Sequence, residues 1–117
     1  MIVIDELAEV LDKSGLDKAE KNLVDSIERK LSTLIRLGRA SGIHCILATQ
    51  RPDSEILRGQ IRSNIDAKFC SRCDSTLSIL LLGDAEASTR IPKNELGLFM
   101  GCDKVLFKSF ILDLKNL

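Results

Sequence analysis

The sequence predicts an α/β protein with a mainly parallel sheet, flanking helices and a C-terminal β-hairpin. Two observations predict this class. Short apolar runs of strand length, rich in β-branched residues, alternate with segments whose apolar residues recur at helical spacing. The order strand, helix, strand, helix, strand favours parallel strands joined by right-handed crossovers. A chain of 117 residues has the size of one small domain, so we expect a single domain over residues 1–117.

The first half of the chain is expected to hold a strand, a short helix and a long helix. A continuous Ile-Val-Ile run predicts a buried strand over residues 2–5, and a short helix can follow over Leu7–Leu11. Asp17 can cap the long helix, which is expected to end near Gly38 or Gly42. Five apolar residues recur on one face of that helix: Leu23, Ile27, Leu31, Leu34 and Leu37.

The second half is expected to continue the alternation. The expected elements are a strand over Ile43–Ala48, a helix over Glu55–Ser63 capped by Ser54, a strand within residues 66–74, a helix over Thr76–Leu82 capped by Asp74, and a hairpin that turns at residues 101–104. The final hairpin rests on the apolar runs "GLFM" and "VLFKSFILDL" on either side of the turn "GCDK".

Composition and charge narrow the possible functions. The chain has four Phe and neither Trp nor Tyr, which argues against base stacking on an aromatic surface. Net charge is zero, yet residues 1–28 carry −5 and residues 29–72 carry +6, so the basic middle could meet phosphate or form a solvated face. No leader and no long apolar run is visible, so we expect a cytoplasmic location, reduced thiols and no membrane contact from this segment.

Polar side chains follow two of the predicted strands. The first strand ends at Asp5 and Glu6, and the next ends at Thr49 and Gln50. Ligands gather at the carboxyl ends of parallel strands, so these four residues are expected to share one crevice. In that crevice Asp5 could orient hydrated Mg²⁺, Glu6 could polarise an attacking water as general base, and Gln50 could bind that water or a γ-phosphate. Taken alone, the first pattern also fits a strand that ends in two solvated acids.

A longer stretch carries a more specific signal. "LIRLGRASGIHCILATQRP", residues 34–52, closely resembles the segment that follows the Walker B strand in the FtsK/SpoIIIE family of DNA-translocating motors. In that family an apolar run with Asp-Glu precedes a helix ending in Arg-x-Gly-Arg-Ala-x-Gly-Ile-His, and a strand then runs into Ala-Thr-Gln-Arg-Pro. "ILRGQIRSNIDAKF" continues the match, and the resemblance covers residues 2 to about 100.

This resemblance implies a partial RecA-like P-loop NTPase fold that uses ATP and Mg²⁺ to move double-stranded DNA through a hexameric ring. It makes Asp5 and Glu6 the Walker B pair, with Asp5 holding Mg²⁺ through water and Glu6 and Gln50 in catalysis. Asp5, Thr49 and Gln50 would then contact the nucleotide. The arginines Arg58 and Arg62 lie where the family turns a loop toward DNA, and mobile basic side chains suit contacts to phosphates rather than bases.

Two features depart from the family pattern. The phosphate-binding loop G-x-x-x-x-G-K-[ST] occurs nowhere in the chain, so the chain resembles the C-terminal half of a motor domain and would need the missing N-terminal half as a partner. Such a half-domain should expose one apolar face of its sheet. Some family members also carry a Ser-Arg pair where this chain has Ser78-Ile79, so the arginine that acts on a neighbour's nucleotide would be Arg72 or Arg51.

Three functional hypotheses remain open. The first is part of an ATP-driven DNA translocase for chromosome segregation or conjugation. The second is a catalytically inactive remnant that binds DNA or an intact motor, and without the phosphate loop the isolated chain is expected to be inactive. The third is part of a secretion-system motor, against which the basic positions Arg58 and Arg62 argue.

Overall fold

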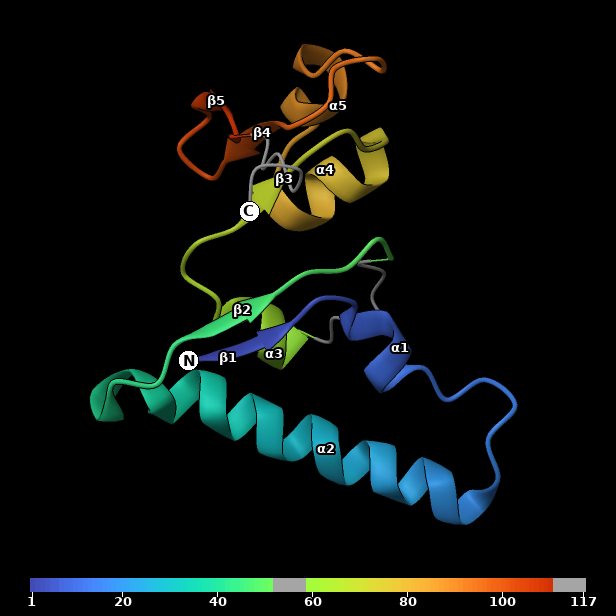
Figure 1. Ribbon diagram of the computed structural model, residues 1–117. Coiled ribbons are helices and arrows are strands. Elements are labelled where there is room, and N and C mark those ends of the chain that lie inside the picture. Colours follow the sequence, from blue (N-terminus) through green and yellow to red (C-terminus); the bar gives the residue numbers. More distant parts are fainter. Residues whose placement is uncertain (52–58, 111–117) are drawn as a thin grey trace, which may run out of the picture. The chain divides into compact units, whose positions relative to one another are not determined.

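The computed structural model describes residues 1–51 and 59–110 and shows a mixed α/β protein (Figure 1). It contains a two-stranded parallel sheet and a three-stranded antiparallel sheet. The chain divides into two compact units, Met1–Asp66 and Ala67–Leu117. The α/β class with a parallel sheet and a C-terminal hairpin is therefore confirmed, and each unit is described by itself below.

The first unit is built around two parallel strands. Its elements are β1 (Ile2–Ile4), α1 (Leu7–Leu11), α2 (Lys18–Leu37), the 3-10 helix η1 (Gly38–Ser41), β2 (Cys45–Leu47) and α3 (Gly59–Ser63). The strands run in register, with Val3 opposite Ile46. The pairing extends past both strands, because Ala48 N–H donates to the Ile4 carbonyl and Leu7 N–H donates to the Ala48 carbonyl, each at 2.8 Å.

The two faces of this sheet differ in exposure. Val3 and Ile46, which are register partners on one face, are 58% and 53% exposed. Their neighbours along each strand point to the other face and are half-buried. One apolar face of the sheet is therefore open, as the sequence predicts.

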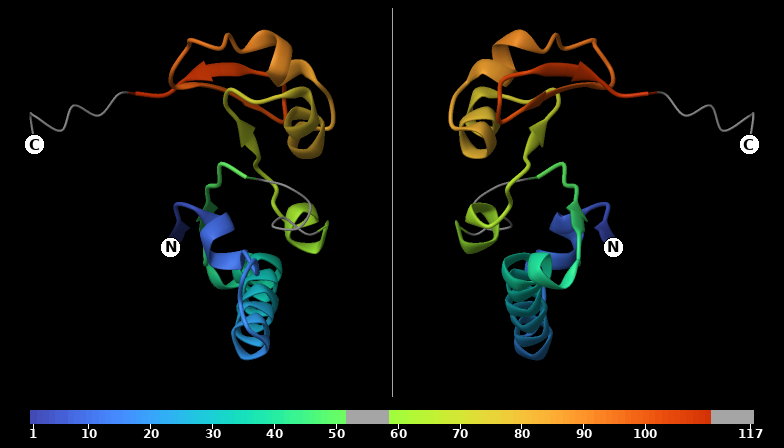
Figure 2. Two further views of the ribbon diagram at one scale, coloured as in Figure 1. Left: turned by 90° about the vertical axis from the view of Figure 1, so that its right-hand side faces the viewer. Right: turned by 90° about the vertical axis from the view of Figure 1, so that its left-hand side faces the viewer.

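Helix α2 begins as predicted, and its predicted apolar face is buried only in part. The Asp17 carboxylate accepts a hydrogen bond from Glu20 N–H, and the Glu20 carboxylate accepts one from Asp17 N–H, each at 2.9 Å, which completes a capping box. Of the five leucine and isoleucine residues of that face, Leu31 is buried but Leu23 is 62% exposed, and Val24 beside it is buried instead. The short helices α1 and α3 both contact α2, and the ribbon in Figure 2 shows α1 beside α2.

The second unit holds the antiparallel sheet in the order β3-β4-β5. Its elements are β3 (Phe69–Cys70), α4 (Ser75–Leu82), α5 (Glu86–Arg90), β4 (Leu98–Gly101) and β5 (Leu106–Lys108). The hairpin of β4 and β5 is confirmed. The expectation that the third strand joins the parallel sheet is wrong, since β3 pairs antiparallel with β4, with Cys70 opposite Met100. This pairing buries both side chains against Ala87 and Ile91.

The opposite face of the antiparallel sheet carries three phenylalanines. The ring centroids of Phe69 and Phe107 lie 5.4 Å apart in an edge-to-face arrangement, and those of Phe99 and Phe107 lie 5.7 Å apart in a stack. The strand alternation thus separates an aliphatic face under α4 and α5 from an aromatic face. Asp74 caps α4 as predicted, accepting from Leu77 N–H at 2.8 Å.

Over the residues that the structure describes, no helix combines the length and apolar character needed to cross a membrane.

The capping box at the start of α2 gives a stability prediction. Replacing Asp17 by Ala removes the acceptor for Glu20 N–H and should lower the free energy of unfolding by about 1 kcal/mol. Asp17→Asn keeps an acceptor oxygen and should cost less. Urea denaturation followed by circular dichroism measures both variants, and equal stability of D17A and the wild type would contradict this role.

Candidate functional site

The polar residues that follow β1 and β2 meet at one edge of the parallel sheet. Because the strands are parallel and in register, Glu6 and the Thr49-Gln50 turn lie at the same carboxyl-terminal end. The hydrogen bond from Leu7 N–H to the Ala48 carbonyl joins the two segments just beyond the strands. The two strand ends therefore lie side by side and bring Glu6 to Thr49 and to the Gln50 backbone, which is the part of the nucleotide-site hypothesis that concerns the strands.

The Glu6 carboxylate is the centre of this edge. Its Oε1 accepts hydrogen bonds from the Thr49 hydroxyl at 2.5 Å and from Ala8 N–H at 3.2 Å, and its Oε2 accepts from Gln50 N–H at 2.9 Å. The Thr49 hydroxyl, followed by the Gln50 backbone, lowers the pKa of Glu6 below its ordinary value of 4.5. The same carboxylate caps α1, so it joins β1, α1 and the end of β2.

The turn after β2 is also tied to the end of α1. Arg51 N–H donates to the Thr49 hydroxyl oxygen at 3.1 Å, and the Arg51 guanidinium pairs with the Asp12 carboxylate at 2.7 Å. Asp12 also accepts from Ser14 N–H at 2.8 Å. Hydrogen bonding to Ser14, followed by that to Arg51, holds the pKa of Asp12 well below its ordinary value. Asp12 was missed by the sequence analysis, and its only local signal is the Asp-x-Ser spacing typical of a side-chain turn.

Asp5 lies in a different environment from Glu6. Its side chain is exposed, and no hydrogen bond from the described residues reaches its carboxylate. Adjacent residues at a strand end point to opposite sides, so this contrast with half-buried Glu6 follows from the pleat. Within the described residues no group of three or more His, Cys, Asp or Glu could hold a metal ion. A single free carboxylate does fit Mg²⁺, which keeps several waters and is shared with substrate phosphates.

The candidate DNA-contacting arginines are only partly described. Arg58 lies outside the described residues. Arg62 lies on α3 and is half-buried, and its Nη1 is buried with no hydrogen-bond partner among the described residues. A buried guanidinium nitrogen without an acceptor is costly, so this nitrogen is an unusual feature of α3.

The two candidates for the trans-acting arginine have different contacts. Arg51 forms the ion pair with Asp12, whereas exposed Arg72 donates from Nη1 to the Lys93 carbonyl. At the position of the family's Ser-Arg pair, Ser78 is fully buried and Ile79 is 54% exposed. The Ser78 hydroxyl donates to the Asp84 carbonyl at 2.6 Å and accepts from Ala87 N–H at 3.2 Å, which is a structural role.

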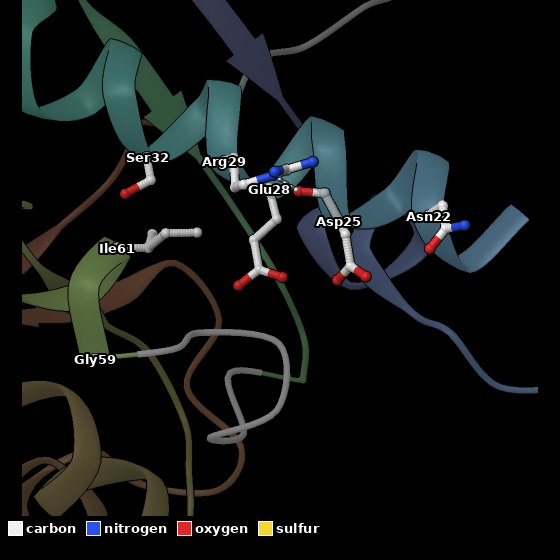
Figure 3. Close-up of a pocket in the computed structure, with 7 residues that line it drawn as sticks. All are labelled: Asn22, Asp25, Glu28, Arg29, Ser32, Gly59 and Ile61. Carbon is white, nitrogen blue, oxygen red and sulfur yellow. Dashed lines mark hydrogen bonds between the residues drawn. The ribbon is translucent and has the colours of Figure 1, made fainter. Parts of the chain in front are cut away.

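A separate pocket of about 780 Å³ lies between α2 and α3 (Figure 3). It is lined by Asn22, Asp25, Glu28, Arg29, Ser32, Gly59 and Ile61. Two of these residues are acidic, and both their carboxylates bind Lys13. Because both carboxylates are already paired within the protein and no strand end among the described residues lines this pocket, we keep the strand ends as the candidate nucleotide site.

Curated proteins similar to the chain share one name. The chain is 30% identical over 102 residues to DNA translocase FtsK of Rickettsia typhi, which covers 86% of the chain. It is 32% identical over 89 residues to DNA translocase FtsK of Listeria monocytogenes, covering 74% of the chain, and 31% identical over 101 residues to that of Brucella melitensis, covering 86%. The chain spans about 12%, 11% and 11% of these relatives. No protein-family model matches the chain.

A solved structure matches almost the whole chain. The conjugation coupling protein TcpA of pCW3, in its monomer form with ATPγS, is 38% identical with a TM-score of 0.88. The match covers 97% of this chain and 33% of TcpA. Sequence and fold thus point to the same group of proteins.

The Asp12–Arg51 pair gives a prediction about pH. Because the pKa of Asp12 is lowered in the folded state, its stabilising effect is present above the ordinary value of 3.8 and is lost as pH falls below it. Asp12→Asn should therefore flatten the fall in unfolding free energy across that acid range, as measured by urea denaturation at several pH values.

A second variant measures the contribution of Arg51 to the lowered pKa of Asp12. Arg51→Met removes the guanidinium but leaves the Ser14 hydrogen bond, so it should raise the pKa of Asp12 only part of the way toward 3.8. Carboxyl carbon NMR measures that titration. An Asp12 titration that is the same in R51M and the wild type would show that the ion pair does not form in solution.

Proposed function

This chain is an FtsK/SpoIIIE-type segment, and we propose that it supplies the Walker B and γ-phosphate-sensing half of an ATP site in a double-stranded DNA translocase. One observation carries the proposal: the Glu6 carboxylate bridges the ends of β1 and β2 through Thr49 and Gln50. One acid of the pair thereby contacts the Thr49-Gln50 turn at the edge of the sheet where ligands of parallel α/β proteins bind, and the other acid, Asp5, precedes it in the chain.

The residues at this edge have separable roles. Asp5, exposed and free of protein hydrogen bonds among the described residues, would hold hydrated Mg²⁺, which would neutralise phosphate charge. Glu6 takes a proton from the attacking water as general base. Thr49 lies beside Glu6, and Gln50, which is exposed, would meet the γ-phosphate end of ATP.

The remainder of the site comes from outside this sequence. The chain contains no phosphate-binding loop, and it spans 33% of TcpA and about 12% of the R. typhi FtsK. We propose that residues 1–117 form a single partial motor domain and that an N-terminal half provides the loop. The exposed side chains of Val3 and Ile46 support this, because an apolar sheet face needs a covering layer. A hexameric ring, a cytoplasmic location and a trans-acting Arg72 or Arg51 remain predictions from the family resemblance.

Double-stranded DNA is the proposed cargo. Relatives of this chain are named DNA translocase, and the structural neighbour is a conjugation coupling protein. Arg58 and Arg62 are proposed to contact DNA phosphates, which fits movement along DNA of any sequence.

A second candidate function keeps the fold without catalysis. The absence of G-x-x-x-x-G-K-[ST] favours, for the isolated chain, an inactive segment that binds DNA or docks on an intact motor. A secretion-system motor segment, which would move protein instead, is the weaker alternative.

The catalytic role of Glu6 is tested after joining the chain to the part of TcpA that precedes the matched region. We expect this fusion to hydrolyse ATP with stimulation by DNA. Glu6→Gln should lower kcat by about 10²- to 10⁴-fold while ATP binding persists, because the general base is lost. A coupled ATPase assay and calorimetry measure the two quantities.

The matched control is Glu9→Gln on the exposed side of α1, which removes the same charge without removing the hydrogen bonds of Glu6. Undiminished hydrolysis in E6Q would refute the Walker B assignment. Micromolar affinity of the isolated chain for Mg·ATP would instead exclude the inactive-segment hypothesis.

The DNA-binding role is tested with the isolated chain. Arg62→Ala should weaken binding to duplexes of different sequence to the same extent and reduce the slope of log affinity against log salt by about 0.9. Arg58→Glu with Arg62→Glu should abolish binding, whereas Arg90→Glu on α5, which matches each single reversal in charge, should leave binding close to that of the wild type. Fluorescence anisotropy with labelled duplex measures this. Unchanged affinity in the double variant would favour a protein-moving motor.

A further inference from the structure

The hydrogen bonds of Glu6 use its two oxygens unequally. A carboxylate oxygen has two lone pairs, and Oε1 accepts from both the Thr49 hydroxyl and Ala8 N–H. Oε2 accepts only from Gln50 N–H among the described residues. One acceptor position of this carboxylate is therefore left, and it lies on Oε2.

The direction of the Thr49 hydrogen bonds is fixed by its neighbours. Arg51 N–H can only donate, so the Thr49 hydroxyl oxygen accepts from it at 3.1 Å. The Glu6 carboxylate can only accept, so the single hydroxyl proton is donated to Oε1. Thr49 then has no proton with which to donate to a phosphate, which is itself an acceptor.

From this geometry we propose that Thr49 is a positioning residue for Glu6. The Thr49 hydroxyl and Ala8 N–H together occupy both acceptor positions of Oε1 and fix the orientation of the carboxylate. Only Oε2 can then accept a hydrogen bond from the water that Glu6 polarises. This inference rests on the proposed function. It gives the two residues at the end of β2 different roles: Thr49 orients the general base Glu6, and Gln50 contacts the γ-phosphate. The Asp12–Arg51 ion pair supports the arrangement, because Arg51 contributes both that pair and the amide bound by Thr49.

The first test needs no ATP hydrolysis. In the isolated chain, Thr49→Val removes the hydroxyl at nearly constant volume, so the carboxylate should loosen and the amides of Ala8 and Gln50 should exchange with solvent about two- to tenfold faster. Thr49→Ser keeps the hydroxyl and should restore wild-type exchange. Thr49→Ala serves as a second hydroxyl-free variant if T49V does not fold. Nitrogen-resolved amide exchange by NMR measures all of them.

The second test uses the TcpA fusion described above. T49V should lower kcat by about 10- to 100-fold with an unchanged KM for ATP, because a misplaced base affects only the chemical step, and T49S should recover activity. A rise in KM with unchanged kcat would make Thr49 a nucleotide contact and overturn the inference.

Failures of the inference and of the proposed function are distinguishable. Wild-type amide exchange at Ala8 and Gln50 in both T49V and T49A would overturn the positioning role whatever the fusion does. Faster exchange that is reversed in T49S supports it even where E6Q leaves hydrolysis intact, which would count against the ATPase proposal alone.

Discussion

The rest of the candidate site depends on one carboxylate, that of Glu6, held between two parallel strand ends. Three donors from two places in the chain converge on it: Ala8 N–H from α1, and the Thr49 hydroxyl and Gln50 N–H from the end of β2. Such charge-assisted hydrogen bonds are stronger than neutral ones, and together they fix where α1 begins. The buried Leu7 at the start of α1 follows directly from that position. The hydrogen bonds of Glu6 at the sheet edge thus also determine where a buried residue of α1 packs.

The sequence could predict those features that local rules govern. The caps at Asp17 and Asp74 follow from side-chain chemistry, and the opposite environments of Asp5 and Glu6 follow from the strand pleat. The proximity of Glu6 to Thr49 also follows, because parallel strands end at one edge. These features need no knowledge of distant packing.

Features that depend on contacts between distant parts of the chain could not be predicted from the sequence. The pairing of β3 with β4 is decided by burial of Cys70 and Met100 under α4 and α5, and no local pattern at Phe69–Cys70 specifies an antiparallel neighbour. Helix α2 has more apolar residues than its neighbours cover, so helical spacing alone could not tell buried Val24 from exposed Leu23. The Asp12–Arg51 pair joins residues 39 apart in sequence, and each is an ordinary surface residue by composition.

The same contacts bear on which arginine is able to act on a neighbouring subunit. Arg51 would have to leave the carboxylate of Asp12, an ion pair with the donor and acceptor 2.7 Å apart, and its departure would also disturb the turn that orients Glu6. Among the described residues, exposed Arg72 would leave only the neutral carbonyl of Lys93, and a hydrogen bond between a cation and a carbonyl is weaker than one between two charges. A side chain that must reach a neighbouring subunit and return would be better supplied from the weaker contact. If the proposed ring forms, we therefore propose Arg72 rather than Arg51 as the trans-acting residue.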